Sequence, residues 1–255
     1  MKTARFYLLS LLVMVALSLA ACGGATSTET GGEEAPSAQP TQADTSGGEQ
    51  APLASGGDWM IDPANATNTN ARAAVGYVYE GLMRMEGGEP VGALAESYTV
   101  SEDGLDYIFN LRPGVTFHDG TLLTADVVIV NFYRWFDPGD PDRGSGEFLA
   151  WLENFGGFKG ELTEEGAPKS IYDGIEKVND FTVLIHLNTE DPDFLKKMSD
   201  PAFSIASPAS FNGGDGGSGP YQFVSMSGSI ATLEPFTGYW NASAIPASGM
   251  EVPVE

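Results

Sequence analysis

Two histidines offer the widest choice of chemistry in this sequence. His118 stands before Asp119 and Gly120 in the stretch GVTFHDGTLLTADVV, and His186 lies in a distant segment. A zinc site needs further ligands, and neither histidine has a partner at the spacing of a helical ligand pair. Asp-Gly is a typical turn sequence, because glycine supplies the positive φ that such turns require. We therefore expect His118 and Asp119 to form a turn, with no metal and no cofactor.

A second group of patterns concerns nucleotide binding and nucleophilic catalysis. Residues 214–219, GDGGSG, match the G-x-G-x-x-G pattern of dinucleotide loops. Such a loop has to leave a strand and begin a helix, whereas here Pro220 and Tyr221 lead into a strand-like segment. The G-x-S-x-G nucleophile elbow and the lysine-containing phosphate loop are both absent. The sequence therefore predicts an ordinary loop and no catalytic residue, and a secreted hydrolase would have only the two histidines to rely on.

The N-terminus carries a secretion signal. Two basic residues precede an apolar run over residues 6–19, which ends in small residues before Cys22, the only cysteine of the chain. The run is shorter than the roughly 20 residues of a membrane-spanning helix. The tetrapeptide Leu19-Ala20-Ala21-Cys22 resembles the lipobox of bacterial lipoproteins, which implies a signal peptide over residues 1–21 and a lipidated Cys22. The alternative is a cysteine that merely follows an ordinary signal peptide.

The segment after Cys22 differs in composition from the rest of the chain. Residues 22–57 are dominated by Gly, Ser, Thr, Ala, Pro, Gln and acidic side chains, with Leu53 as the only large apolar residue. This composition cannot bury enough apolar surface to offset the entropy lost on ordering. We expect a disordered tether that holds a domain away from a membrane. Residues 58–255 are long enough for one large domain or two small ones.

The charge of the chain limits its partners. There are 35 acidic and 12 basic residues, and the formal net charge is −23. Nucleic-acid-binding surfaces need the opposite sign, so nucleic acid is excluded as a partner. The acidic excess favours solubility outside the cell, and an acidic surface that attracts ligands is the alternative.

Several secondary-structure elements follow from periodicity and from turn and cap residues. Alternating apolar residues predict a strand that follows a turn at Glu102-Asp103-Gly104, and a second strand over residues 182–188. Thr124 as N-cap predicts a helix over residues 125–136, although the VVIV run favours a strand. The remaining predictions are a short strand at residues 115–117, a loop-like region over 137–170, a short helix opened by Asp191-Pro192, and a hairpin of 221–226 with 230–233.

Four large side chains are candidates for lining a ligand pocket. Trp59 and Met60 lie where the tether enters the fold, and Trp135 and Trp151 flank the glycine-rich central region. Aromatic residues often line the pockets of small ligands. The alternative is that all four are packing residues of the core.

Several stretches together are similar to one known family. They are YEGL at 79–82, LAESYTVSEDGLDYIFNLRPGVTFHDGTLLTADVV at 94–128, VNDFTVLIHL at 178–187 and GSGPYQF at 217–223. With Tyr239-Trp240 they resemble the extracellular solute-binding proteins of family 5, the peptide and nickel class of ABC importer receptors. The resemblance implies a type II periplasmic-binding-protein-like clamp of two α/β lobes with mixed sheets, closing on a ligand.

The resemblance also implies a domain division. Residues 83–170 would form a small extra domain, residues 58–82 and 171–245 part of the first lobe, and residues 246–255 a tail. Family members are about twice as long, so the chain is expected to hold only the first lobe and the extra domain.

The function implied by the resemblance is binding rather than catalysis. The chain would be a lipid-anchored receptor at the extracytoplasmic face of the membrane, which binds an oligopeptide, a dipeptide or a similar small solute and delivers it to ABC permease subunits. The alternative is a surface interaction module made from half of a solute-binding fold.

Overall fold

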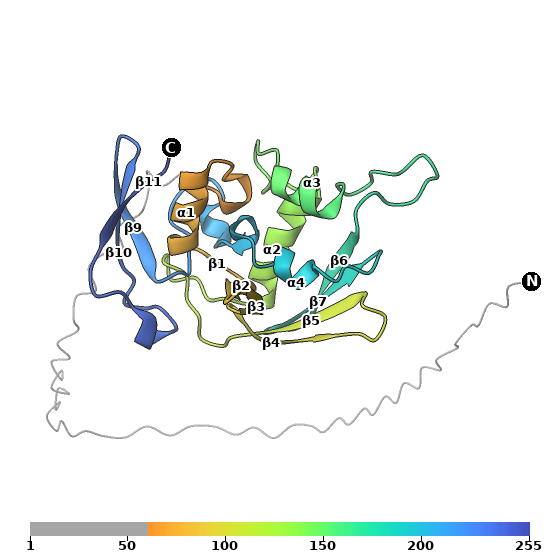
Figure 1. The fold of residues 1–255 in the computed structure, drawn as a ribbon, viewed down its shortest axis with the longest axis horizontal. Helices are drawn as coiled ribbons and strands as arrows, with labels where there is room; N and C mark the ends of the chain where they lie inside the picture. Colours follow the sequence, from red (N-terminus) through yellow and green to blue (C-terminus); the bar gives the residue numbers. More distant parts are fainter. Residues whose placement is uncertain (1–60) are drawn as a thin grey trace, which may run out of the picture. The chain divides into compact units, whose positions relative to one another are not determined.

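A computed structural model describes residues 61–255 (Figure 1). The signal peptide, Cys22, the tether, Trp59 and Met60 lie outside these residues, so the predictions made for them are not addressed by the structure. Among residues 61–255, no helix combines the length and the apolar character needed to cross a bilayer.

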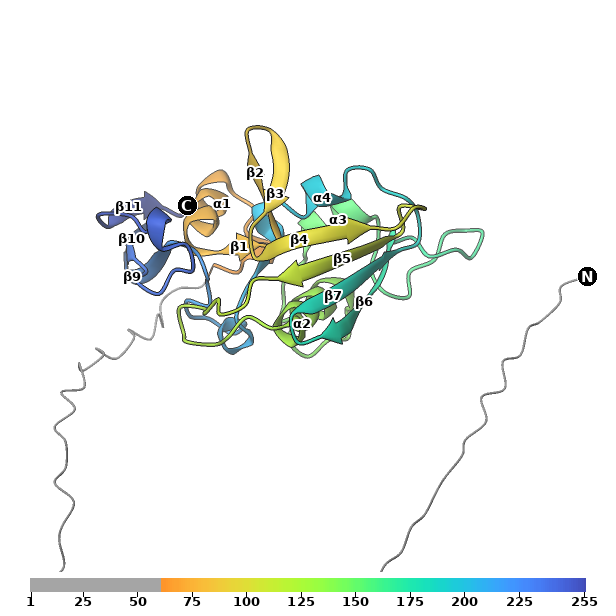
Figure 2. The ribbon, with the colours of Figure 1, turned by 90° about the horizontal axis from the view of Figure 1, so that it is seen from below.

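The central element is an antiparallel sheet of four strands in the order β4-β5-β7-β6 (Figure 2). Its strands are β4 (Ala95–Val100), β5 (Asp106–Leu111), β6 (Tyr172–Asn179) and β7 (Thr182–Leu187). Tyr107 pairs with Ile185 and Phe109 with Val183, and all four side chains are buried on one face. The alternation that predicted strands at β5 and β7 is therefore confirmed, with the turn at residues 102–104 joining β4 to β5.

Helices α2 (Ala125–Phe136), α3 (Leu149–Phe155) and α4 (Phe194–Lys197) cover the apolar face of this sheet (Figures 1 and 2). The predicted helix at 125–136 is confirmed, and Thr124 caps it by accepting a hydrogen bond from the amide of Val127 at 3.4 Å. The strand propensity of its VVIV run is overridden, because Val127 and Val128 are buried against the core.

Two predictions near these helices need correction. Residues 137–170 contain α3 and are not loop throughout; its buried side chains are Trp151 and Phe155. The helix expected from Asp191 begins only at Phe194, because Asp191 forms a turn in which its carboxylate accepts the amide of Asp193 at 3.1 Å.

A second sheet lies beside helix α1 (Thr69–Val78). Its strands β9 (Tyr221–Ser227), β10 (Ile230–Pro235) and β11 (Met250–Pro253) are antiparallel, with β10 in the middle. The predicted hairpin of β9 and β10 is confirmed, whereas β11 forms within residues expected to be a tail. Val75 and Val78 of α1 pack with Phe223, Leu233 and Val252 in a core of their own.

Shorter elements complete the described chain. They are η1 (Pro63–Asn65), β1 (Glu80–Gly81), β2 (Met83–Glu86), β3 (Glu89–Gly92), η2 (Pro201–Phe203), β8 (Ser204–Ile205), η3 (Pro208–Ser210) and η4 (Ala242–Ala244). Strand β1 pairs with β8, and β2 pairs with β3.

The expected division at residues 170 and 171 does not coincide with a break between sheets. Strands β4 and β5 precede this position and β6 and β7 follow it, yet all four belong to one sheet. The cores divide the chain differently: the larger one takes in side chains from Ala64 to Ile205, and the second combines α1 with residues after 205. The assignment of these parts to lobes stays a prediction.

Candidate ligand-binding site

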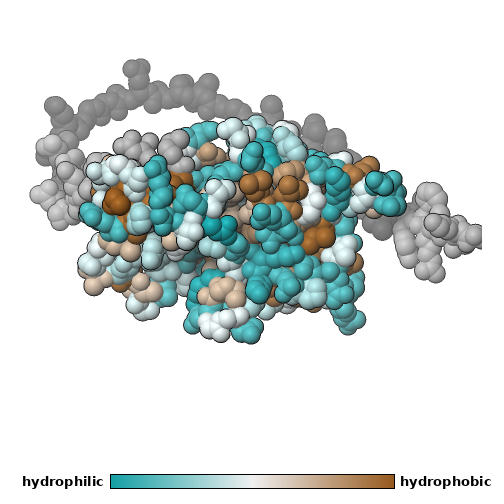
Figure 3. Space-filling view, turned by 45° about the horizontal axis from the view of Figure 1, so that its top comes forward, coloured by the Kyte–Doolittle hydropathy of each residue, from teal (hydrophilic) through white to brown (hydrophobic). Residues whose placement is uncertain are grey.

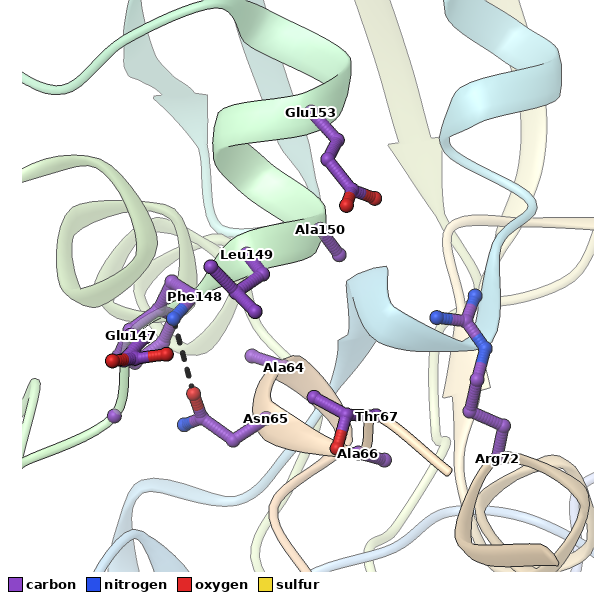
Figure 4. A pocket seen from close by; sticks show the side chains of 11 residues that line it. Ala64, Asn65, Ala66, Thr67, Arg72, Glu147, Phe148, Leu149, Ala150 and Glu153 are labelled. Atoms are coloured by element: carbon purple, nitrogen blue, oxygen red, sulfur yellow. Dashed lines mark hydrogen bonds between the residues drawn. The ribbon is translucent and has the colours of Figure 1, made fainter. Parts of the chain in front are cut away.

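A pocket of about 340 Å³ lies between the segment η1–α1 and the start of α3 (Figure 4). Its lining residues are Ala64, Asn65, Ala66, Thr67, Arg72, Gly146, Glu147, Phe148, Leu149, Ala150 and Glu153. This volume lies at the lower end of the roughly 300–1,000 Å³ typical of small-molecule sites.

The first wall is built by two capped helical turns. Asp62 begins η1 by accepting the amide of Ala64 at 3.1 Å, with Pro63 at the first helical position. Asn68 begins α1 by accepting the amide of Ala71 at 2.7 Å. Thr67 lies exposed between the two turns. Two rigid caps therefore hold the short segment 64–67 at the pocket.

The second wall depends on one unusual backbone conformation. Phe148 has a φ of 52°, and it is the only non-glycine residue with positive φ among the described residues. Its amide donates to Oδ1 of Asn65 at 3.2 Å, the bond drawn in Figure 4. Backbone strain of this kind persists only where surrounding contacts enforce it, and it is frequent at ligand sites. Asn65 thus joins the two walls.

The side chains at the pocket carry both signs of charge. Arg72 on α1 is bound to Asp200, and Glu153 on α3 extends into the space between the walls (Figure 4). Within the described chain, neither Glu147 nor Glu153 forms an ion pair. Free carboxylates can accept hydrogen bonds from an ammonium group, and Thr67 adds the only hydroxyl side chain of this lining. The arrangement suits the binding of a ligand with an ammonium group.

Apolar side chains lie next to these charges. Leu149 and Leu152 of α3 are 41% and 39% exposed, and Leu149 lines the pocket. The face shown in Figure 3 is largely polar, with apolar residues in small groups between the polar ones. A ligand with a charged end and a modest apolar part would match this lining.

Trp135 and Trp151, predicted as pocket aromatics, are each only 1% exposed. Their ring centroids lie 6.3 Å apart in the main core, and Nε1 of Trp151 donates to the carbonyl of Gly157 at 3.1 Å. Neither side chain lines the pocket described above. The structure gives both residues a packing role, and a ligand contact by either one stays a prediction.

The turn at His118 is confirmed, with Gly120 at a φ of 86°. The expected strand at 115–117 is reduced to one bridge, between Thr116 and Leu122. His118 is buried, and its ring lies 2.7 Å from Oδ1 of Asp215 and 2.9 Å from the carbonyl of Gly219. Among the described residues, no cluster of three or more His, Cys, Asp or Glu could hold a metal.

The glycine-rich loop around Asp215 therefore has a structural role. A Cβ on Gly217 would lie 2.0 Å from the carbonyl oxygen of Val78, so the loop packs tightly on the end of α1. It continues into strand β9 rather than into a helix, as predicted. His118 and the loop together attach the turn at 118–120 to the second sheet.

Glu80 holds another segment in place. Its carboxylate accepts hydrogen bonds from the Tyr239 hydroxyl and the Trp240 indole, both at 2.8 Å. Burial raises the pKa of Glu80, and burial beside that carboxylate raises the pKa of Tyr239 as well. These groups lie outside the lining of the pocket and fix the segment that follows β10.

Sequence reasoning did not find the residues that line this pocket. Asn65, Thr67 and Glu153 are ordinary polar residues without a motif. The signals available in the sequence were the two caps, Asp62 with Pro63 and Asn68, which define a short rigid connection. Glu153 could not be placed, because the helix that carries it was read as loop.

Comparisons with known proteins agree with this fold. The model of the family described as bacterial extracellular solute-binding proteins, family 5 Middle, matches residues 89–251. The glutathione-binding protein GsiB of Pectobacterium atrosepticum is 31% identical over 191 residues, which are 71% of this chain and 33% of that protein. GsiB of Escherichia coli strain K12 is 28% identical over 189 residues, with the same coverage. The chain thus spans about a third of the length of these relatives.

Solved structures show the same architecture. HbpA2 from Haemophilus parasuis matches with a TM-score of 0.64 at 26% identity, over 76% of this chain and 41% of that one. DppA from Helicobacter pylori, solved in complex with the peptide STSA, matches with a TM-score of 0.61 at 24% identity, over 79% and 41%. The fold is therefore part of a type II periplasmic binding protein, as expected. The chain belongs to family 5 of the bacterial extracellular solute-binding proteins.

Proposed function

We propose that this chain is the ligand-binding component of an ABC importer for small peptides or related solutes, held at the extracytoplasmic face of the cell membrane by a lipid on Cys22. The observation that carries the proposal is the pocket between η1 and α3, in a chain whose family is one of solute-binding proteins. The lipid anchor rests on the Leu19–Cys22 tetrapeptide alone.

The lining of the pocket favours a ligand with a free amino group. Glu153 extends into the pocket without an ion pair inside the described chain, and an ammonium group is its natural partner. Arg72 keeps Asp200 as its partner, and the apolar side chain of Leu149 can pack against an aliphatic part of the ligand. Peptides carry an amino group, aliphatic parts and backbone amides in one small molecule.

The relatives support the same class of ligand. GsiB of two bacteria is named as a glutathione-binding protein, and the Helicobacter pylori DppA was solved with a bound peptide. Glutathione is itself a tripeptide with a free amino group. We therefore propose short peptides, including glutathione, as the first ligands to test.

Isothermal titration calorimetry of the full chain tests the proposal. The panel contains glutathione, dipeptides and tripeptides, each also in an N-acetylated form that lacks the ammonium group. We expect saturable binding of at least one free peptide and weaker binding of its acetylated form. Glu153→Gln should bind the free peptide about tenfold more weakly, because a hydrogen bond to a charged group contributes about 1.5 kcal/mol or more.

The matched control is Glu164→Gln, which removes an exposed carboxylate outside the lining of the pocket. It should bind as the wild type does. Absence of saturable binding across the whole panel, or equal affinity for free and acetylated peptides, contradicts the proposal.

A further inference from the structure

A second cavity of about 340 Å³ lies on the other side of Asn65. It is bounded by residues 61–65, by the end of α2, and by loops around residues 144 and 212. Asn65 and Gly146 line both this cavity and the candidate peptide pocket, so their contact forms the wall between the two. The residues on which the following argument depends are Asp62, Arg134, Arg143 and Phe211.

The cavity concentrates positive charge in a strongly acidic chain. Arg134 is 2% exposed, and it contacts the carboxylate of Asp62. Its Nε is buried and has no hydrogen-bond partner in the part of the chain that the structure describes. Arg143 forms no ion pair within residues 61–255, so two guanidinium groups face a single carboxylate. Arg143 is only partly buried, whereas the unpartnered Nε of buried Arg134 normally requires an acceptor, which favours an additional anion in this cavity.

Charged groups outside the lining of the cavity also act on Arg143. Burial lowers the pKa of Arg143, and the charge of Arg134 lowers it further. Asp137 and Asp140 act in the opposite direction. The carboxylate of Asp137 binds Lys159 at 2.6 Å, and that of Asp140 accepts the amide of Asp142 at 2.9 Å and keeps its negative charge. Within residues 61–255 neither carboxylate forms an ion pair with Arg143, so its guanidinium remains available to a further acceptor.

The hydrogen bonds of Arg143 leave its carboxylate-binding edge free. Nη1 donates to the carbonyls of Arg134 and Trp135 at 2.9 and 2.7 Å, which uses both of its hydrogens. Within residues 61–255 its Nε and Nη2 groups have no acceptor, and this edge of a guanidinium binds a carboxylate through two parallel hydrogen bonds. Phe148 and Phe158 lie 4.2 and 4.4 Å from the guanidinium carbon and hold its plane in place.

We propose that this second cavity binds a small carboxylate ligand, held by Nε and Nη2 of Arg143 beside the buried guanidinium of Arg134. The ring of Phe211 lies 4.2 Å from the guanidinium carbon of Arg134 and offers an apolar surface to the rest of the ligand. A carboxylate attached to an aromatic or aliphatic group fits this lining better than inorganic phosphate, which has no apolar part to pack against Phe211. The site goes beyond the proposed peptide pocket and does not depend on it.

Calorimetric titration of the full chain with benzoate, acetate and inorganic phosphate tests this site. We expect one saturable site for benzoate, weaker binding of acetate and no saturable binding of phosphate. Arg143→Gln should weaken benzoate binding by at least about tenfold, and Arg143→Lys should weaken it less, because the charge remains while the paired hydrogen bonds are lost. The matched control is Arg84→Gln, which removes an exposed arginine on β2.

Three results overturn the site: no saturable benzoate binding, tighter binding of phosphate than of benzoate, or unchanged benzoate affinity in folded Arg143→Gln. If Arg143→Gln does not fold, the wild type still decides the question. Titration with benzoate should then shift the Nε–H resonance of Arg143 in a nitrogen-15 NMR spectrum, and an unchanged resonance rejects the site.

Discussion

Gly146→Ala should destabilise the chain although it removes no atom. A Cβ at residue 146 would lie 2.1 Å from Nδ2 and 2.3 Å from Oδ1 of Asn65, far inside contact distance. Gly146 is not among the residues with positive φ, so the alanine is not opposed by its own backbone conformation. The side chain of Asn65 therefore has to move.

The magnitude follows from the hydrogen bonds that Asn65 would lose. Nδ2 donates to Asp62 at 2.9 Å, and Oδ1 accepts the amide of Phe148 at 3.2 Å. Each bond contributes about 0.5–1.5 kcal/mol net, so their loss amounts to about 1–3 kcal/mol. Replacing glycine by alanine also lowers the conformational entropy of the unfolded chain, which stabilises the folded chain by about 0.4–1 kcal/mol. The difference spans about 0–2.6 kcal/mol, and we expect a net loss near its middle, about 1 kcal/mol.

Urea unfolding followed by tryptophan fluorescence measures this loss. The control is Gly174→Ala on β6, where a Cβ would meet nothing within 4 Å and φ is also not positive. In the double variant Asn65→Ala with Gly146→Ala, the second substitution should add little, because the clashing amide is gone. Equal stability of Gly146→Ala and the wild type, or full additivity in the double variant, would refute the proposed role of Asn65 as the link between the two walls.

Two further predictions concern partly buried carboxylates away from the pocket. Folding raises the pKa of Glu80 above its ordinary value of 4.5. Above pH 4.5 the folded chain therefore keeps a proton that the unfolded chain has lost. The free energy of unfolding should fall as the pH rises through the window that begins near 4.5. Glu80→Gln should flatten this decline in thermal melts recorded from pH 4 to 8, and an unchanged slope would contradict the assignment. Asp215→Ala removes the acceptor for buried His118 and for two backbone amides. Because each hydrogen bond to a carboxylate contributes about 1.5–3 kcal/mol, the substitution should lower the free energy of unfolding by about 3 kcal/mol or more in urea titrations. A loss below about 1 kcal/mol would show that the His118 pair does not hold the turn to the second sheet.

Local signals were sufficient for the regular elements of the main sheet. Helix α2 was predicted with its observed bounds because Thr124 caps it and no turn residue interrupts it. Strand β5 followed from alternation that matches its buried face. Helix α3 was missed because it has only seven residues, lies between glycines, and begins after Phe148, which forms no side-chain cap.

The candidate site depended on contacts that sequence spacing does not encode. Asn65 and Phe148 lie 83 residues apart, and His118 and Asp215 lie 97 apart. The sequence suggested large aromatic side chains as pocket residues, yet Trp135 and Trp151 are buried in the core. The polar residues that do line the pocket became candidates only after the fold brought η1 and α3 together.

The central claim is that the pocket between η1 and α3 binds a small peptide. Its most direct test is a nitrogen-15 NMR titration of the full chain with the tightest ligand found in the peptide panel. We predict saturable shifts concentrated at residues 64–67 and 146–153, which line the pocket from both walls. Saturable shifts confined to other parts of the described chain, such as strands β9–β11, would contradict the claim.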